Sequence, residues 1–233
     1  MQIAVFDIET IPAQNLPDGV APKFDPLSVK FGNTKDQAKR DAKEAAERAK
    51  FNHGLDKKMS LHPDQCEVVC FCGAIYDTTT GDIDRLTISG EPATISDGWT
   101  FIYDAYHKAI PIVSYNGNGF DLPVMLHRAM YLNIPMSRRI YNELTRRYST
   151  KSHIDLMQVL ADWDRQKWES LDFYLRSFGL GGKTGDGGQV YGMWKDGKHK
   201  EIEEYCMNDV LSTAELFARI ESWIVEGIGV DDA

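Results

Sequence analysis

The sequence has no excess of positive charge: 35 Asp and Glu residues outnumber 26 Lys and Arg residues, and the formal net charge is −9. Proteins that hold nucleic acid by bulk electrostatic attraction carry a strongly basic surface, so the net charge argues against that class. The net charge does not exclude an enzyme in which bound metal ions supply the local positive charge.

Long apolar runs are also missing from the chain. No stretch has the length and hydrophobicity of a transmembrane helix, and the first residues have neither the basic nor the apolar region of a signal peptide. Four cysteines in 233 residues do not form a disulfide scaffold. These absences predict a cytoplasmic protein with no membrane partner.

Neither an internal repeat nor a convincing linker divides the chain, so residues 1–233 are expected to form a single domain. Residues 13–60 are expected to be an insertion in it. Proline, aspartate and glycine punctuate the first part of this segment, and a helix rich in Ala, Lys and Glu is expected over 34–49, capped by Asn33 or Thr34. Its apolar face is mostly alanine, so it should bury little. Its mixed charges favour a solvated face, with a clamp or a partner-docking surface as the alternative.

The remaining elements follow from apolar periodicity and turn residues. Strands are expected at 2–6, 67–76, 83–89 and 110–115. Helices are expected at 97–108, 120–132, 152–163, 168–178 and 201–226, with a loop over 179–188. Three strands, a helix, another strand and then helices indicate an α/β fold, a mixed β-sheet flanked by helices.

Carboxylates stand at the end of, or inside, three otherwise apolar segments. Asp7 and Glu9 follow the first strand and, two residues apart, point to one face of an extended chain. Asp121 follows a glycine-rich turn, and Asp209 lies one helical turn after Tyr205. Hard divalent cations prefer oxygen ligands, and two such ions together can activate a water and stabilise a leaving oxygen. Four clustered carboxylates would repel one another without metal, so the set predicts a metal-dependent site.

Each of these residues also has an ordinary structural explanation. An aspartate after a strand is commonly a turn residue, and Asp121 would serve equally well as a cap for the helix that follows it. Tyr205 and Asp209 would be a packed tyrosine beside a solvated aspartate. The prediction of a site therefore depends on the combination rather than on any one position.

In combination, these segments resemble the DEDD (DnaQ-like) superfamily of 3'-to-5' exonucleases. Residues 6–10 (Phe-Asp-Ile-Glu-Thr) are similar to its first motif, residues 116–121 (Asn-Gly-Asn-Gly-Phe-Asp) to its second, and residues 205–209 to its third, Tyr-x-x-x-Asp. The tyrosine, where another branch has histidine, indicates the DEDDy branch.

Within that branch, the chain looks most like stand-alone exonucleases related to the proofreading domain of family B DNA polymerases. The similarity extends through 153–156, 170–172 and 182–183, and it leaves 13–60 unmatched.

The resemblance implies an RNase H-like fold and catalysis by two divalent metal ions, Mg²⁺ or Mn²⁺. Asp7 would bridge the two ions, Glu9 and Asp209 would complete the ligands of the first, and Asp121 would support the second. Tyr205 would hydrogen-bond and orient the attacking water, with help from Glu9.

The resemblance also implies residues around the substrate. Thr10, Asn116 and Phe120 would contact the terminal nucleotide. Asp155 would support the metal ligands from behind, or would be a capping or surface aspartate.

Outside the motifs, a basic stretch interleaved with tyrosines surrounds Arg146 and Arg147, and we expect it to follow the backbone of a single strand. A solvated helix surface is the alternative. Lys183, in a glycine-rich loop, would contact a phosphate, or the loop would simply end a helix. The segment 177–184 lacks the first glycine of a P-loop, so ATP binding is not expected. Cys66, Cys70 and Cys72 lack zinc-ligand spacing and are interpreted as buried thiols.

The predicted function is removal of nucleotides from the 3' end of single-stranded DNA, with replication or repair proteins as partners. A 3'-to-5' RNA exonuclease is one alternative, because the same site serves both polymers. The others are an endonuclease of the RNase H-like class and a non-catalytic binding module associated with a polymerase. No polymerase domain is visible in the sequence, so any proofreading would act in trans.

Overall fold

Eleven consecutive residues, Gln2–Pro12, form the central strand β1 of the computed structural model, which describes residues 1–182 and 187–225. The other strands are β2 (Cys66–Asp77), β3 (Ile83–Ser89), β4 (Ile112–Ser114) and β5 (His153–Asp155). They form one sheet in the order β3-β2-β1-β4-β5. β1 runs antiparallel to β2 and parallel to β4, and β4 runs parallel to β5, so the sheet is mixed.

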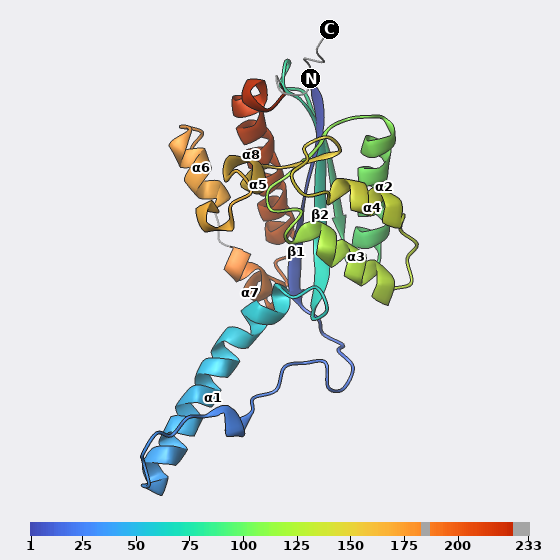
Figure 1. The fold of residues 1–233 in the computed structure, drawn as a ribbon. Helices are drawn as coiled ribbons and strands as arrows, with labels where there is room; N and C mark the ends of the chain where they lie inside the picture. Colours follow the sequence, from blue (N-terminus) through green and yellow to red (C-terminus); the bar gives the residue numbers. More distant parts are fainter. Residues whose placement is uncertain (183–186, 226–233) are drawn as a thin grey trace.

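Alternating side chains of β1 enter two separate cores, as expected of a strand buried on both faces. Ile3 and Val5 belong to one core, and Phe6 and Ile8 to the other. Helices α6 (Leu171–Ser177), α7 (Val190–Lys195) and α8 (His199–Val225) supply the first core. Helices α2 (Ala93–His107), α3 (Asp121–Tyr131) and α4 (Arg138–Leu144) supply the second, and Figure 1 shows the two groups on opposite faces of the sheet. The predicted RNase H-like α/β fold is confirmed.

A long helix, α1 (Gln37–Ser60), follows β1 and projects away from the sheet, with the chain that precedes it running alongside (Figure 1). The helical segment predicted after the first strand is therefore present, but its bounds differ. Asp36 caps the helix by accepting from the backbone N–H of Lys39 at 3.3 Å, and the helix continues to Ser60 rather than ending at 49. Met59 is its only buried residue, which confirms that it buries little. The hydroxyl of Thr10 donates to the carbonyl of Ser60 at 2.7 Å and ties the end of α1 to β1.

The structure corrects the element predicted at 152–163. Its first residues form strand β5, because residues 153–155 pair with β4, and only α5 (Leu156–Leu160) is helical. The carboxylate of Asp155 accepts from the backbone N–H groups of Met157 and Gln158, so this residue both ends the strand and caps the helix. Helix α4 begins the basic stretch for which a solvated helix surface was the alternative, and helix α7 was not predicted. No helix in the described ranges is long and apolar enough to cross a membrane.

Candidate active site

Asp7 and Glu9 lie inside β1 rather than after it, where alternation would place apolar residues. They follow Ile3 and Val5 along the odd-numbered side chains of the strand, which face α8. Across the ladder, Asp7 is the partner of Cys72 and Glu9 is the partner of Cys70. Glu9 is 8% exposed, and the register shifts between Glu9 and Thr10. Two carboxylates therefore replace core residues at the centre of the sheet.

Asp121 reaches the same strand from the start of α3. Its Oδ1 accepts a 3.2 Å hydrogen bond from the backbone N–H of Ile8, the peptide that joins Ile8 to Asp7. Asp121 is 3% exposed, and burial raises the pKa of its carboxyl to about 7, with further contributions from the charges of Asp155 and Asp209. The buried carboxyl therefore lies in a field of other carboxylates, which is the environment expected of a cation site.

Helix α8 brings the third motif to the same place. Tyr205 is buried on α8, and the charge of Asp209, one turn further along, acts on Asp121. Between them, Sγ of Cys206 lies 3.5 Å from the backbone oxygen of Asp7 and 3.7 Å from its Oδ2. Ligand atoms of Asp7, Glu9 and Cys206 lie within 4.8 Å of one another. The structure thus places Asp7 and Glu9 beside Cys206 of α8 and ties Asp121 of α3 to β1, and the charge of Asp209 on α8 acts on Asp121.

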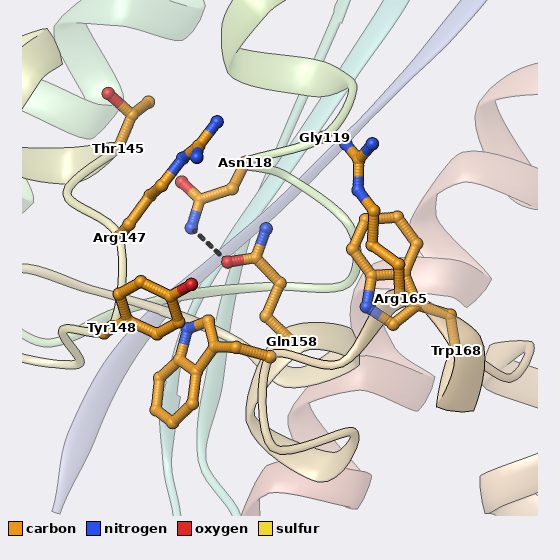
Figure 2. A pocket seen from close by; sticks show the side chains of 9 residues that line it. Asn118, Gly119, Thr145, Arg147, Tyr148, Gln158, Arg165 and Trp168 are labelled. Atoms are coloured by element: carbon orange, nitrogen blue, oxygen red, sulfur yellow. Dashed lines mark hydrogen bonds between the residues drawn. The ribbon is translucent and has the colours of Figure 1, made fainter.

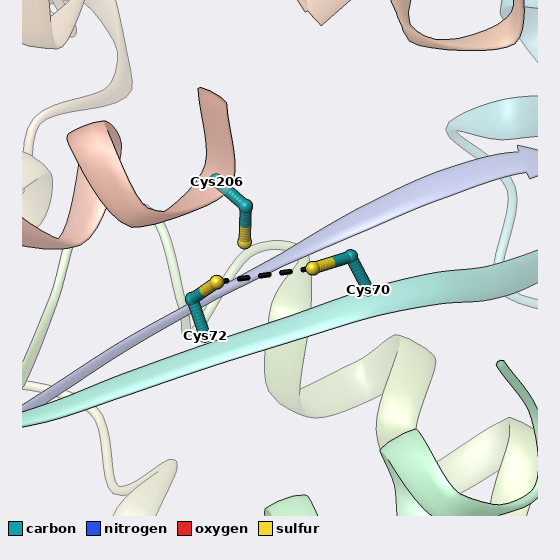
Figure 3. Close-up of side chains that lie close together, drawn as sticks. All are labelled: Cys70, Cys72 and Cys206. Atoms are coloured by element: carbon teal, nitrogen blue, oxygen red, sulfur yellow. Dashed lines mark hydrogen bonds between the residues drawn. The ribbon is translucent and has the colours of Figure 1, made fainter. Parts of the chain in front are cut away.

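Three thiols, those of Cys70, Cys72 and Cys206, lie close together between β2 and α8 (Figure 3). The Sγ atoms of Cys70 and Cys72 are 3.8 Å apart, and Cys206 extends toward them from α8. Hydrogen bonds with Cys206 and Cys70 lower the pKa of the Cys72 thiol below its ordinary value. Cys66, which the sequence grouped with Cys70 and Cys72, instead lies in the opposite core. All four cysteines are buried free thiols.

The turn between β4 and α3 is held by its small residues. Asn116 adopts a left-handed conformation, with φ of 68°. A Cβ on Gly117 would lie 2.2 Å from Oγ of Ser114, and a Cβ on Gly119 would lie 2.3 Å from Oδ1 of Asn116. Glycine at both positions therefore lets the turn pack closely enough to present Phe120 and Asp121 at the start of the helix.

Asp155 and His153, on β5, hold this turn from beneath. The carboxylate of Asp155 accepts from the backbone N–H groups of Asn116 at 2.9 Å and Asn118 at 3.0 Å, and the residue is 2% exposed. Nε2 of His153 lies 2.7 Å from Oγ of Ser114, and burial lowers the pKa of the imidazole to about 4. Asp155 is a capping aspartate, as one of its two explanations held, although it is buried rather than on the surface, and its support of the metal ligands stays a prediction.

A cavity of about 500 Å³ opens beside Glu9. Glu9, Thr10 and Phe120 line one part of it, and Lys57 of α1 and Lys195 of α7 line another. A Cβ on Gly187, which also lines the cavity, would lie 3.6 Å from the hydroxyl of Tyr205, so that hydroxyl is close to the cavity wall. The contributions of α1 and α7 were not predicted, because nothing in the sequence relates these helices to the motifs.

The predicted substrate residues are more dispersed. Arg146 and Arg147 are exposed in the segment that follows α4, and Arg147 lines a second cavity, which also contains Asn118 and Gly119 (Figure 2). Lys183 lies outside the described residues. Asn116 is partly buried at the base of the turn, and Phe120 follows it.

The donor set of the site suits a hard divalent cation. Its carboxylates supply oxygen ligands, and the buried carboxyl of Asp121 requires a nearby positive charge to ionise at low pH. Asp7, Glu9, Asp121 and Asp209 are the residues that could hold such ions. Cys206 contributes a softer donor at the edge of the group. Its proximity to Asp7 was not predicted, because 199 positions separate the two residues in sequence.

Comparison with known proteins adds a family and a fold. Residues 65–226 match the model of a family described as predicted 3'-5' exonucleases related to the exonuclease domain of PolB. The chain resembles the solved family B DNA polymerase from the hyperthermophilic archaeon Pyrobaculum calidifontis, with 19% identity and a TM-score of 0.56. That similarity covers 97% of this chain and 25% of the polymerase, so it supports the fold alone. No curated protein was found to match.

Proposed function

Because the match spans residues 65–226, the chain belongs to the family of predicted 3'-5' exonucleases related to the exonuclease domain of PolB, and we propose that it removes nucleotides from the 3' end of single-stranded DNA with two divalent metal ions, Mg²⁺ or Mn²⁺. The match begins after β1, so it leaves Asp7 and Glu9 to be argued from geometry. The proposal rests on Asp7 and Glu9 lying side by side on one strand, on the hydrogen bond that ties Asp121 to that strand, and on the charge of Asp209 acting on Asp121.

In the proposed mechanism, these four carboxylates hold the ions, as the resemblance to the DEDDy branch implies. The bound ions would polarise the scissile phosphate and lower the pKa of the attacking water. The hydroxyl of Tyr205, close to the wall of the 500 Å³ cavity, hydrogen-bonds that water and fixes its direction of attack. Glu9, in the same cavity, accepts a hydrogen bond from the water.

The reaction is a hydrolysis. An oxygen of water bonds to phosphorus, the bond from phosphorus to the leaving O3' breaks, and the proton released from water ends on O3'. The products are a nucleoside 5'-monophosphate and a strand shortened by one residue with a new 3' hydroxyl.

The terminal nucleotide would occupy the cavity between β1 and the turn. The ring of Phe120 provides a stacking surface, and Thr10 contacts the sugar. Asn116 does not line this cavity, and its contact with the terminal nucleotide is proposed from the resemblance alone. Lys57 and Lys195, which face this cavity from α1 and α7, would attract the phosphate. In this proposal residues 13–60 are an insertion in a single exonuclease domain that supplies one wall of the active site.

A degradation assay tests the proposal. A single DNA strand labelled at its 5' end should yield a ladder of shortened products in Mg²⁺, and a strand labelled at its 3' end should release the labelled monophosphate first. Chelation of the metal and Asp7→Ala should each abolish both results, whereas Asp84→Ala, an exposed aspartate on β3, should not.

Parallel substrates separate the alternatives. Faster degradation of a matched RNA strand would indicate that RNA, rather than DNA, is the preferred substrate. Cleavage of circular single-stranded DNA would indicate an endonuclease. Binding without cleavage of any strand in either metal would leave a non-catalytic module and overturn the proposal.

A further inference from the structure

The second cavity, of about 360 Å³, lies on the other side of the turn from the candidate active site. Asn118 and Gly119 line it, whereas the next residue, Phe120, lines the first cavity. The two cavities are therefore separated by one turn of chain. A nucleic-acid strand with its last nucleotide in the first cavity would therefore need only a short stretch of its backbone to reach the second cavity.

Three aromatic rings line this second cavity, from segments that the motifs do not include. Tyr148 is 74% exposed, and its ring centroid lies 5.9 Å from that of Trp163 at an interplanar angle of 56°. Trp168 lies on the opposite side of the view in Figure 2. The tilted pair is not stacked on itself, so its faces remain accessible to a planar ligand.

Unusual backbone conformations hold two of these rings. Tyr148 and Trp163 both have positive φ, 57° and 56°, a region that large side chains seldom adopt. The backbone N–H of Trp163 donates to the backbone carbonyl of Gln158 at 2.8 Å. Nδ2 of Asn118 donates to the side-chain Oε1 of Gln158 at 3.2 Å. Backbone strain that persists on an exposed surface is a common feature of binding sites. Here it positions the rings relative to the same turn that carries Phe120 and Asp121.

Two arginines give the cavity a positive charge. Arg147 and Arg165 line it, on either side of the hydrogen-bonded pair Asn118 and Gln158 (Figure 2). Within the described part of the chain, neither arginine forms an ion pair with a carboxylate, and no acidic residue lines the cavity. The guanidinium of Arg165 lies 5.1 Å from the ring centroid of Trp168, which orients it without neutralising it. In a chain with a net charge of −9, this is a local site for an anion.

Rings that accept a planar group and guanidinium groups that accept an anion together match the chemistry of a nucleotide. We infer that this cavity is an upstream subsite, in which a base of the single strand stacks on Trp163 or Trp168 and its phosphate binds Arg147 and Arg165. The inference rests on the proposed function for the direction of the strand, but not for the chemistry of the subsite. Such a subsite would make the protein bind strands that span both cavities more tightly than shorter strands.

The test measures binding by the full chain as a function of strand length. Fluorescence anisotropy of 5'-labelled oligothymidines, without divalent metal so that no strand is cleaved, should give a higher affinity for a long strand than for a dinucleotide. Trp163→Ala combined with Trp168→Ala should remove most of that gain and lower the affinity for the long strand roughly 5- to 150-fold. Trp163→Phe and Trp168→Phe, which retain rings, should restore much of it. Melting curves of all variants establish that they are folded.

Arginine variants test the binding of phosphate separately. Arg147→Ala with Arg165→Ala should reduce the slope of log affinity against log salt concentration by about 0.7 for each phosphate that the variant no longer neutralises. Trp223→Ala, at an 86% exposed tryptophan of α8, and Arg85→Ala, on β3, are the matched controls and should change neither the length dependence nor the slope.

The outcomes separate this inference from the proposed function. If the wild-type chain degrades strands but the tryptophan and arginine variants keep the full increase in affinity with strand length, the inferred subsite is contradicted and the proposed exonuclease activity is supported. If no strand is degraded but the variants lose length-dependent binding, the subsite stands and the exonuclease is wrong. A preference for a free mononucleotide over the long strand, abolished by the same variants, would also overturn the inference.

Discussion

Oδ1 of Asp121 accepts a hydrogen bond of 3.2 Å from the backbone N–H of Ile8, and this bond joins the start of α3 to the strand that carries Asp7 and Glu9. The two positions are 113 residues apart in sequence. The bond fixes the carboxyl of Asp121 beside the peptide of Asp7, in a buried place where a negative charge is unfavourable without a compensating cation.

The stability of the metal-free protein should therefore depend on the ionisation of Asp121. The folded-state pKa of about 7 lies above the ordinary value of 3.8, so the folded chain binds this proton more tightly than the unfolded chain does. The resulting stabilisation is fully present below about pH 4 and is lost as the pH rises through about 7. In chelator, the free energy of unfolding of the wild type should fall relative to Asp121→Asn over this range, by a few kcal/mol. Denaturant titrations at several pH values measure the difference, and a difference that does not change with pH would contradict the assignment.

His153 should make the free energy of unfolding depend on pH in the opposite direction. Burial lowers the pKa of its imidazole from 6.5 to about 4, so the unfolded chain takes up this proton first as the pH falls. The stabilisation is present above about pH 6.5 and is lost on acidification through about pH 4, with a magnitude on the order of 3 kcal/mol. His153→Gln should lack this component. Comparing the acid transitions of the two proteins in denaturant measures it, and identical pH profiles would show that the ring is not held neutral.

The two glycines of the β4–α3 turn should respond differently to substitution. A Cβ at Gly117 meets Oγ and Cβ of Ser114, which is 1% exposed, so Gly117→Ala should destabilise the fold by roughly 1–3 kcal/mol. A Cβ at Gly119 meets the end of the Asn116 side chain, which can move. Gly119→Ala should therefore cost less stability but lower the rate of strand degradation, because it displaces a residue proposed to contact the terminal nucleotide. Equal losses of stability in the two variants, from denaturant curves, would not fit this account of the turn.

Stability can also be changed away from the site. Nε and Nη2 of Arg128 donate to the two carboxylate oxygens of Glu91 at 3.0 and 2.7 Å, and these side chains are 12% and 7% exposed. Arg128→Ala would leave the buried carboxylate of Glu91 without its cationic partner and with only the backbone N–H of Val68, so we expect a loss of roughly 3 kcal/mol in the free energy of unfolding. Degradation rates well below the melting temperature should be retained. Arg139→Ala, which breaks an exposed pair with Glu143, is the control and should cost at most about 0.5 kcal/mol.

The sheet and its main helices were predictable because apolar periodicity is a local property. Residues 83–89 were predicted as a strand and form β3, and the helix expected over 201–226 is α8. The end of β1 was harder to predict from the sequence, because Asp7 and Glu9 interrupt the apolar run that marked it as a strand. Strand β5 was missed because its three residues are strand-like only through their pairing with β4, whereas the residues that follow are helical.

The approach of the four carboxylates agrees with the resemblance to known motifs, but their surroundings required the structure. Cys206 reaches Asp7 only because α8 packs against β1, and no spacing in the sequence encodes that proximity. The same holds for Lys57, which lines the active-site cavity because α1 is longer than its alanine-rich part suggested. Trp163 and Trp168 lie in a segment without a motif, and only the folded arrangement places them near Arg147.

In the proposed function, Asp7, Glu9, Asp121 and Asp209 together hold two divalent ions. Crystals of the wild-type chain soaked in Mn²⁺ test it by anomalous scattering, with Asp7→Asn crystals as the control. We expect two anomalous peaks among these four carboxylates in the wild type and the loss of at least one in the variant. Mn²⁺ bound elsewhere, or four well-ordered carboxylates with no peak between them at saturating Mn²⁺, would contradict it.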